Sequence, residues 1–124
     1  MKNRTILYVD DEESALKLLK LGLEKKGFVV QTCMNGLDAL EYLQTSTPDL
    51  IITDLRMQPM NGFDLYQAVK KIKNAANVPF LFLTAVDDSL AKKFSQTLGI
   101  DGYILKPVDL ERLVSVIRSK LGEK

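Results

Sequence analysis

The sequence contains no histidine and a single cysteine, Cys33. Without histidine, the chain has no Ser-His-Asp or Cys-His catalytic triad and no histidine-ligated zinc site of its own. One cysteine cannot form an intrachain disulfide, which is typical of a reducing compartment and predicts a cytoplasmic protein. Cys33 stands at the end of a short apolar run, where a free cysteine usually packs as a small hydrophobic residue; a reactive thiol is the alternative.

An excess of one charge and a long hydrophobic segment are also missing. The 17 basic and 16 acidic residues give a formal net charge of +1 and are interspersed, so the sequence indicates neither a nucleic-acid surface nor a polybasic membrane patch. The apolar run at residues 6–9 is too short for a signal peptide or a membrane-spanning helix. With 124 residues and no Gly- or Ser-rich linker, residues 1–124 are expected to form one domain.

Five apolar runs of strand length alternate with five segments in which apolar residues recur at helical spacing. Near-continuous apolar runs are typical of parallel strands covered by helices on both faces, and five units are too few for an eightfold barrel. The sequence therefore predicts an open α/β fold with strands at 6–9, 28–30, 50–52, 80–83 and 103–105. On the second and fourth helices, the residues expected to face inward are Leu37, Leu40 and Leu43, and Leu90, Ala91, Phe94 and Leu98.

Four of the five predicted strands run directly into a polar residue that is capable of chemistry. In an open parallel sheet, ligands bind beyond the carboxyl ends of the strands, and in the flavodoxin-like order 2-1-3-4-5 these four strands are neighbours. We therefore expect three carboxylates, one hydroxyl and one ammonium to share a pocket. In chain order they are Asp10 and Asp11, Asp54, Thr84, and Lys106.

This set of side chains favours phosphoryl transfer to a carboxylate. Close carboxylates repel one another, and Mg²⁺, which prefers oxygen ligands, would offset the repulsion between Asp10, Asp11 and Asp54. Asp54, alone at the end of the central strand, is the best candidate nucleophile for an aspartyl phosphate. Lys106 offers a positive charge to a phosphoryl oxygen, and Thr84 offers a hydrogen bond.

The segments YVDDEESA, LIITDLRM, LFLTA and YILKP together resemble the receiver domain of two-component response regulators, similar to the chemotaxis response regulator fold. Each segment alone is a weak signal, but all four occur in order and each lies at a strand end. The resemblance covers essentially the whole chain. It implies a (βα)5 flavodoxin-like fold with a five-stranded parallel sheet of order 2-1-3-4-5 and helices on both faces.

The resemblance implies a role for each matching residue. Asp54 matches the phosphoacceptor, Asp10 and Asp11 match the acidic pair that holds Mg²⁺, and the main-chain carbonyl of Arg56 would complete the metal site. Further matches are Thr84 as the switch hydroxyl, Ala85 as the small residue that leaves room for the phosphoryl group, Tyr103 as the aromatic switch, Lys106 as the phosphate-binding lysine, and Pro107 as the residue after a cis peptide bond.

The function implied is a phosphorylation-activated switch in a two-component phosphorelay, not a conventional enzyme. Because the chain has no histidine, a sensor histidine kinase or histidine phosphotransfer protein must supply the phosphohistidine. A small phosphodonor is the other possible source, and slow autodephosphorylation is expected. The surface of the fourth helix, fifth strand and fifth helix would then be read by a downstream target or by an output domain outside this sequence.

One departure from the family pattern supports an alternative. The family usually has proline four residues after the phosphoacceptor, where this chain has Gln58 followed by Pro59. A receiver-fold binding module that works without phosphorylation is therefore the alternative. A dehalogenase-like hydrolase is disfavoured, because the position two residues after Asp10 is Glu12 rather than aspartate, and nucleotide binding lacks a glycine-rich phosphate loop.

Each candidate residue also has an ordinary structural interpretation. Asp10 and Asp11 could cap the first helix, and Asp54 could belong to a plain turn. Thr84 could be a satisfied residue at the end of a strand, and Lys106 could be a solvated surface lysine. Tyr103 could simply pack in its strand, and Asp87 and Asp88 are expected to begin the fourth helix.

Overall fold

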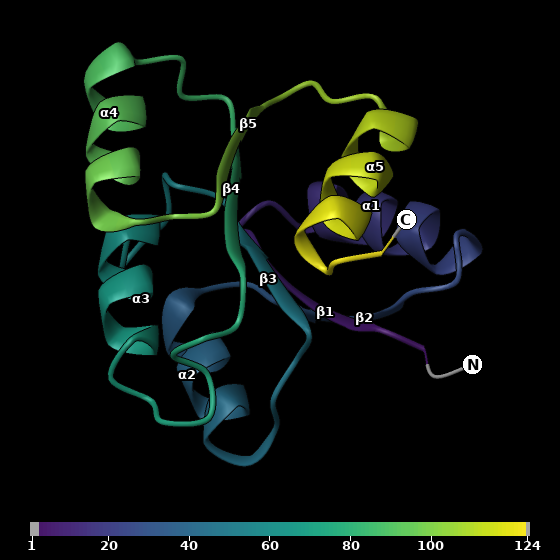
Figure 1. Cartoon of the computed structure of the whole chain (residues 1–124), viewed down its shortest axis with the longest axis horizontal. Coiled ribbons are helices and arrows are strands. Elements are labelled where there is room, and N and C mark those ends of the chain that lie inside the picture. Colours follow the sequence, from purple (N-terminus) through teal and green to yellow (C-terminus); the bar gives the residue numbers. More distant parts are fainter. Residues whose placement is uncertain (1–2, 124) are drawn as a thin grey trace.

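The computed structural model describes residues 3–123 and contains five parallel strands in the order β2-β1-β3-β4-β5. Helices α1 and α5 cover one face of the sheet, and α2, α3 and α4 cover the other (Figure 1). This confirms the predicted flavodoxin-like fold. The elements are β1 Thr5–Val9, α1 Glu13–Lys25, β2 Val29–Cys33, α2 Gly36–Thr45, β3 Leu50–Thr53, α3 Gly62–Val69, β4 Phe80–Thr84, α4 Ser89–Leu98, β5 Gly102–Leu105 and α5 Leu110–Lys120.

The central strands are apolar throughout because both of their faces are buried. On β1, Leu7 and Val9 join the core beneath α2 and α3, whereas Ile6 and Tyr8 join the core beneath α1 and α5. Successive strand residues point to opposite faces, so one strand supplies both cores. Tyr8 therefore lies on the same face of the sheet as Ile6, and this alternation carries on to Asp10.

Asparagine and aspartate side chains begin four of the helices. Asn35, Asp88 and Asp109 each accept a hydrogen bond from a main-chain amide in the first turn of α2, α4 and α5. Asn61 and Asp64 form a reciprocal capping box at the start of α3. The expectation that acidic residues begin the fourth helix is confirmed for Asp88.

The edge strand β2 differs from the prediction. It begins at Val29 and runs to Cys33, whereas the apolar run predicted residues 28–30. Gln31 and Thr32 belong to the strand because β2 lies at the edge of the sheet, where one face is open to solvent and polar residues are accepted. The structure places Cys33 at the end of this longer strand, where it is buried, as expected of a packed thiol.

The inward faces predicted for α2 and α4 are partly wrong. Leu37 is 54% exposed and Leu90 is 76% exposed, while Ala39 and Ser95 are buried instead. The buried Ser95 hydroxyl is satisfied by donating to the Ala91 carbonyl oxygen at 2.8 Å. Leu43 is buried as predicted, and Leu40, Ala91 and Leu98 pack against the same core.

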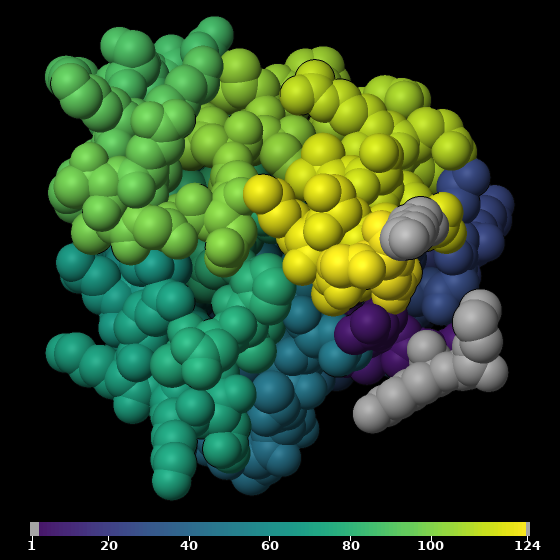
Figure 2. All heavy atoms as spheres, viewed as in Figure 1, coloured from purple at the N-terminus to yellow at the C-terminus, as the bar shows by residue number. Residues whose placement is uncertain are grey.

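Helices α4 and α5 lie over opposite faces of the sheet, on either side of β5 (Figure 1), and their residues, green and yellow, reach the upper part of the space-filling view (Figure 2). Phe94 of α4 is 46% exposed, with its ring 4.9 Å from that of Phe63 in an edge-to-face arrangement.

Among the helices described, none is both long enough and apolar enough to cross a membrane.

Candidate functional site

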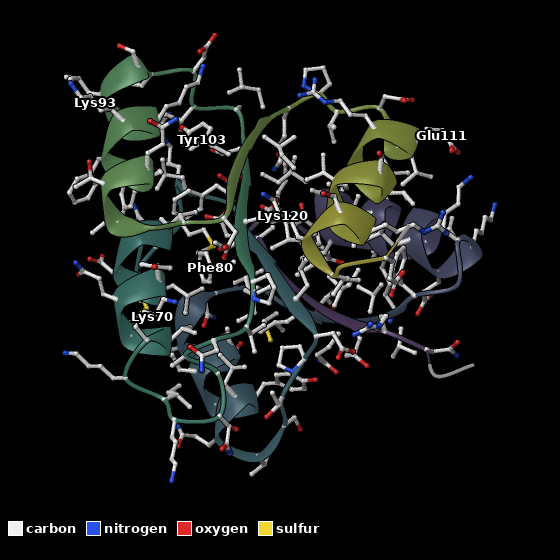
Figure 3. The ribbon with its side chains drawn as sticks, in the orientation of Figure 1. Lys70, Phe80, Lys93, Tyr103, Glu111 and Lys120 are labelled. Carbon is white, nitrogen blue, oxygen red and sulfur yellow. The ribbon has the colours of Figure 1, made fainter. Side chains whose placement is uncertain are left out.

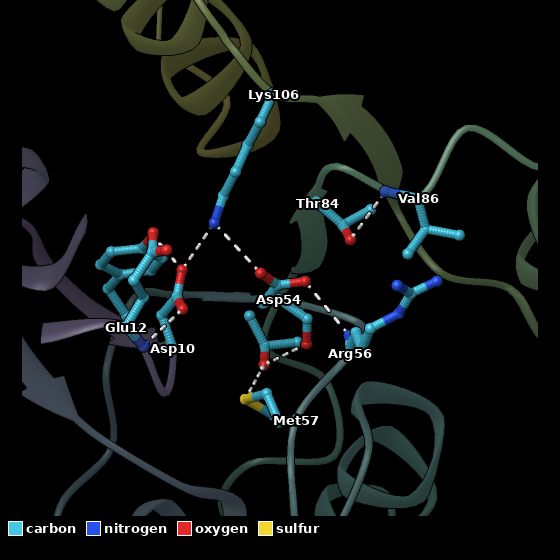
Figure 4. A network of polar contacts seen from close by, with 10 residues as sticks. Asp10, Glu12, Asp54, Arg56, Met57, Thr84, Val86 and Lys106 are labelled. Carbon is cyan, nitrogen blue, oxygen red and sulfur yellow. Dashed lines mark hydrogen bonds and ion pairs between the residues drawn. The ribbon is translucent and has the colours of Figure 1, made fainter. Parts of the chain in front are cut away.

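Three residues from three strand ends come together at the carboxyl edge of the sheet (Figure 4). Lys106 follows β5 and extends its side chain toward the ends of β1 and β3. Its Nζ lies 2.7 Å from Asp10 Oδ2 and 3.0 Å from Asp54 Oδ2. The ammonium therefore bridges two carboxylates that would otherwise repel each other.

Asp10 is fully buried, and both of its carboxylate oxygens accept hydrogen bonds. Oδ1 accepts from the Glu12 amide at 3.0 Å, and Oδ2 accepts from the Tyr8 hydroxyl at 2.7 Å as well as from Lys106. Burial first, and then the hydrogen bond and charge of Asp10, raise the pKa of Tyr8 far above its ordinary value. Asp10 does not cap α1, because residue Glu12 occupies the N-cap position.

Asp54 is held by main-chain contacts on both sides. Its amide donates to the Val9 carbonyl at 2.9 Å, and its Oδ1 accepts from the Arg56 amide at 3.1 Å. Gly62 packs directly behind it: a Cβ at residue 62 would come within 2.7 Å of the Asp54 carbonyl oxygen. The glycine thus lets α3 begin against the strand end that presents Asp54.

The surroundings of Lys106 favour its protonated, positively charged form. Burial by itself would lower the pKa of this lysine, but the hydrogen bonds and charges of Asp10 and Asp54 outweigh burial and raise its pKa above the ordinary value. The side chain of Lys106 is 23% exposed, that of Asp54 is 13% exposed and that of Asp10 is 1% exposed. Of the two carboxylates on the ammonium, Asp54 is the one that solvent reaches.

Thr84 and Tyr103 are connected to each other rather than to Asp54. Thr84 is buried, and its Oγ1 accepts from the Val86 amide at 3.2 Å. The Tyr103 hydroxyl donates to the Val86 carbonyl oxygen at 2.6 Å. The centre of the Tyr103 ring lies 5.9 Å from that of Phe82, edge to face. Figure 3 shows Tyr103 beside α4. Among residues 3–123, no hydrogen bond joins Thr84 to Asp54.

The remaining residues singled out by the sequence lie around this centre. Asp11, the Arg56 side chain, Ala85 and Pro107 are exposed. The Lys106–Pro107 peptide bond is cis, as the resemblance implied, and Gln58–Pro59 is a second cis bond that was not expected. The structure therefore brings together Asp10, Asp54 and Lys106, with the other predicted residues on the adjoining loops and strands.

The family model described as response regulator receiver domain matches residues 6–118. The chain belongs to the response regulator receiver domain family. This confirms the resemblance seen in the four sequence segments.

Individual relatives agree with this assignment. The alkaline phosphatase synthesis transcriptional regulatory protein PhoP of Bacillus subtilis (strain 168) is 38% identical over 105 residues, 85% of this chain and 43% of PhoP. The response regulator ArlR of Staphylococcus aureus (strain Mu50 / ATCC 700699) is 34% identical over 116 residues, 94% of this chain and 52% of ArlR. The chain thus spans about half the length of the curated relatives it matches.

Among solved structures, the chemotaxis response regulator CheY4 of Vibrio cholerae superposes on this receiver domain with a TM-score of 0.89. The two are 28% identical, and the alignment covers 96% of this chain and 99% of that chain. The similarity therefore extends over the whole sheet and all of its connections.

Sequence reasoning missed Tyr8 as a member of the site. The residue stands inside an apolar run and was assigned only to a strand. A signal was present, because Tyr8 and Asp10 are two residues apart and a strand places such residues on one face. Sequence reasoning also did not predict that the Lys106 ammonium contacts Asp10 and Asp54 at the same time.

The donor chemistry of the receiver domain suits Mg²⁺. Among residues 3–123, no three acidic, histidine or cysteine side chains form a ready metal cluster, and Asp11 is turned to solvent beside Asp10. Yet this edge of the sheet carries three carboxylates and one ammonium: Asp10 and Asp54 contact Lys106, and Asp11 adds a third hard oxygen donor beside them, which leaves an excess of two negative charges. A divalent hard cation matches both the charge and the ligand type.

An apolar groove of about 730 Å³ opens beside Lys106, between α1 and the segment that leads into α5. Leu18 and Leu21 on α1 line it and are 74% and 55% exposed. On the other side lie Val108 and Leu110, and Lys106 itself forms part of the wall. The groove is thus continuous with the charged end of the sheet.

Proposed function

We propose that this receiver domain is a phosphorylation-activated switch in which Asp54 accepts the phosphoryl group. The observation that carries the proposal is the unequal exposure of the two carboxylates on Lys106: the Asp54 side chain is 13% exposed, and that of Asp10 is 1% exposed. Asp54 can meet an incoming phosphodonor, whereas Asp10 is enclosed by Tyr8, Glu12 and Lys106.

The reaction is the attack of an Asp54 carboxylate oxygen on the phosphorus of the donor. The new P–O bond forms as the donor bond breaks, P–N in a phosphohistidine or phosphoramidate, and the electron pair of that bond leaves with the nitrogen. The Lys106 ammonium lies 3.0 Å from Asp54 Oδ2. From there it can contact an oxygen of the phosphoryl group on Asp54 and neutralise its negative charge.

Mg²⁺, when bound, supplies further positive charge beside the phosphoryl oxygens. We assign its protein ligands to Asp10, Asp11, Asp54 and the main-chain carbonyl of Arg56. The support for this assignment is the surplus of negative charge at the strand ends, together with the Arg56 amide contact that keeps residue 56 against Asp54 at 3.1 Å.

The switch would operate through Val86. A phosphoryl oxygen on Asp54 offers the Thr84 hydroxyl a charged acceptor, and a move of Thr84 toward it disturbs the loop that also holds Tyr103. Tyr103 then turns into the space vacated, and the surface of α4, β5 and α5 changes. The exposed Leu90 and Phe94 side chains on α4 make this surface suitable for contact with a target.

The partner that supplies the phosphoryl group is a sensor histidine kinase or a histidine phosphotransfer protein. The absence of histidine from the chain supports an external source of phosphohistidine. The apolar groove beside Lys106 offers such a partner a place to dock next to Asp54. We further propose a cytoplasmic location, a single receiver domain over residues 1–124, no direct contact with nucleic acid or membrane, and slow autodephosphorylation in place of conventional enzyme turnover.

The alternative is a receiver-fold binding module that works without phosphorylation, and the displaced Pro59 is the feature in its favour. Against it, the loop still begins at Asp54 with the Arg56 amide contact and closes with a 2.8 Å hydrogen bond from the Gly62 amide to the Leu55 carbonyl. The change of proline position thus leaves both ends of the loop in place.

The test is the intact mass of the protein after incubation with phosphoramidate, with and without MgCl₂, for wild type and Asp54→Asn. We expect one phosphoryl group on wild type, only with Mg²⁺, and none on the variant. Wild type that gains no phosphoryl group and does not bind beryllofluoride, a stable phosphoryl mimic, would favour the constitutive binding module.

A further inference from the structure

Tyr8 is a buried hydrogen-bond donor at the site, and the proposed reaction assigns it no role. Its side chain is 1% exposed in the middle of the sheet, and its hydroxyl donates to Asp10 Oδ2 at 2.7 Å. A buried hydroxyl is costly unless it is bonded, and an apolar residue would fill the core equally well. Within residues 3–123 the hydroxyl is satisfied by Asp10, so the pair is formed by one buried donor and one buried acceptor.

We propose that Tyr8 is a positioning residue that fixes the Asp10 carboxylate, so that Lys106 can leave Asp10 while the carboxylate stays in place to bind Mg²⁺. This inference rests on the proposed function, because it assumes that Asp10 is a metal ligand and that Lys106 moves to a phosphoryl oxygen on Asp54.

Tyr8 and Lys106 share one carboxylate oxygen of Asp10. Asp10 Oδ2 accepts from both Tyr8 and Lys106, each at 2.7 Å, while Oδ1 accepts from the Glu12 amide at 3.0 Å. When Lys106 leaves, Tyr8 still holds Oδ2 and Glu12 still holds Oδ1. Without the Tyr8 hydroxyl, the buried Oδ2 keeps only Lys106 as a donor in the unphosphorylated protein. Once Lys106 leaves, it keeps no donor from residues 3–123.

The anchor is rigid because Tyr8 is part of the sheet. Its neighbours across the ladder are Thr32 on β2 and Ile52 on β3, and its ring belongs to the core beneath α1 and α5. Partners that hold a metal ligand in one orientation commonly account for tenfold or more in metal affinity.

Tyr66 provides a matched control. It is also a buried tyrosine, and its hydroxyl donates to the Leu98 carbonyl oxygen at 2.9 Å in the core on the other face of the sheet. Phenylalanine at either position removes one oxygen and one hydrogen bond and leaves the ring. A general loosening of the fold would therefore affect Tyr8→Phe and Tyr66→Phe alike.

The experiment is a titration of the unphosphorylated protein with MgCl₂, followed by amide NMR shifts, for wild type, Tyr8→Phe and Tyr66→Phe. Thermal unfolding is recorded for all three proteins. We expect Tyr8→Phe to bind Mg²⁺ about tenfold more weakly than wild type and Tyr66→Phe to bind it as wild type does. Phosphorylation by phosphoramidate at saturating Mg²⁺ should also be slower for Tyr8→Phe alone.

Three outcomes would overturn the inference. Equal Mg²⁺ affinity in wild type and Tyr8→Phe would make the hydroxyl a packing feature. Equal losses in both variants, in step with their unfolding temperatures, would mean a general effect of the missing hydrogen bond. Wild type that does not bind Mg²⁺ would remove the ligand role of Asp10. A fourth outcome separates the two proposals: if Mg²⁺ binds and responds to Tyr8→Phe but Asp54 takes no phosphoryl group, Tyr8 still positions Asp10 for Mg²⁺, and the proposed phosphorylation of Asp54 fails.

Discussion

The Tyr103 hydroxyl donates a hydrogen bond to the main-chain carbonyl of Val86 at 2.6 Å. The amide of the same residue donates to the Thr84 hydroxyl at 3.2 Å, so one residue of the β4–α4 loop is tied at both of its peptide groups. Thr84 is buried and Tyr103 is half-buried. A displacement of either side chain must therefore be felt by the other through Val86.

Replacing Tyr103 by phenylalanine removes its bond to Val86 and leaves the ring against Phe82. One net hydrogen bond contributes about 1 kcal/mol. Tyr103→Phe should therefore shift the equilibrium between the present and the inward position of the ring about fivefold toward the inward one. Amide exchange of residues 85–91 in the unphosphorylated protein should then become faster. Exchange rates equal to wild type would show that the Val86 bond does not hold the loop.

Replacing Thr84 by alanine removes the acceptor of the Val86 amide, and Thr84→Ser retains it. We expect Thr84→Ala to lose about 1 kcal/mol of stability. The variant should still take up a phosphoryl group on Asp54, but the amide hydrogen exchange of α4 should not change afterwards. Thr84→Ser should switch as wild type does. The measurement is hydrogen exchange before and after addition of beryllofluoride. An α4 response of normal size in Thr84→Ala would contradict the switch role.

A substitution in the apolar groove should distinguish docking of the partner kinase from the phosphorylation reaction itself. Leu18 is 74% exposed on the wall of the groove, and Leu18→Asp places a charge there. Transfer from a phosphorylated histidine kinase should fall about tenfold, as for a residue at the centre of an interface, while phosphorylation by phosphoramidate should be unchanged.

The control for this substitution is Leu37→Asp, which changes another exposed leucine, 54% exposed on α2, in the opposite helix layer. It should leave both reactions unaltered. Equal transfer from the kinase to wild type and Leu18→Asp would show that the partner docks elsewhere.

Cys33 should be unreactive in the folded protein. Burial, with a smaller contribution from the charge of Asp38, raises its pKa to about 11, so at pH 8 about one thiol in a thousand is ionised. Because the pKa is higher in the folded than in the unfolded state, the associated stability is present below the ordinary thiol pKa and is lost as pH rises through about 11.

The check on Cys33 is alkylation by iodoacetamide at pH 8, which should be slow for native protein and rapid in denaturant. Cys33→Ala should unfold with a shallower loss of stability above pH 9. Rapid alkylation of the native protein would support the reactive-thiol interpretation.

The sequence was sufficient to predict the sheet and its charged edge, because a parallel sheet brings the ends of its strands together whatever the details of packing. Asp10, Asp54 and Lys106 were predicted to converge on this ground, and their side chains do meet. Helix faces were harder to predict. The exposed Leu37 and Leu90, with Ala39 buried on α2, show that the spacing of apolar residues does not by itself tell which of them face the sheet.

The hydrogen bonds that connect site residues could not be predicted from the sequence. Tyr8 looks like one more apolar strand residue until its hydroxyl is seen on Asp10. The connection of Thr84 to Tyr103 through Val86 depends on main-chain geometry in a loop, which residue types do not specify. In both cases, residue type fixed which groups were available, and the fold decided which of them met.

The most direct test of the account locates the phosphoryl group by chemistry. Wild-type protein treated with phosphoramidate and MgCl₂ is reduced with borohydride, which converts an acyl phosphate of aspartate to homoserine, and is then digested and sequenced by mass spectrometry. The account predicts homoserine at position 54 and aspartate at positions 10 and 11. Homoserine at position 10 or 11, or unmodified aspartate at position 54, would contradict it.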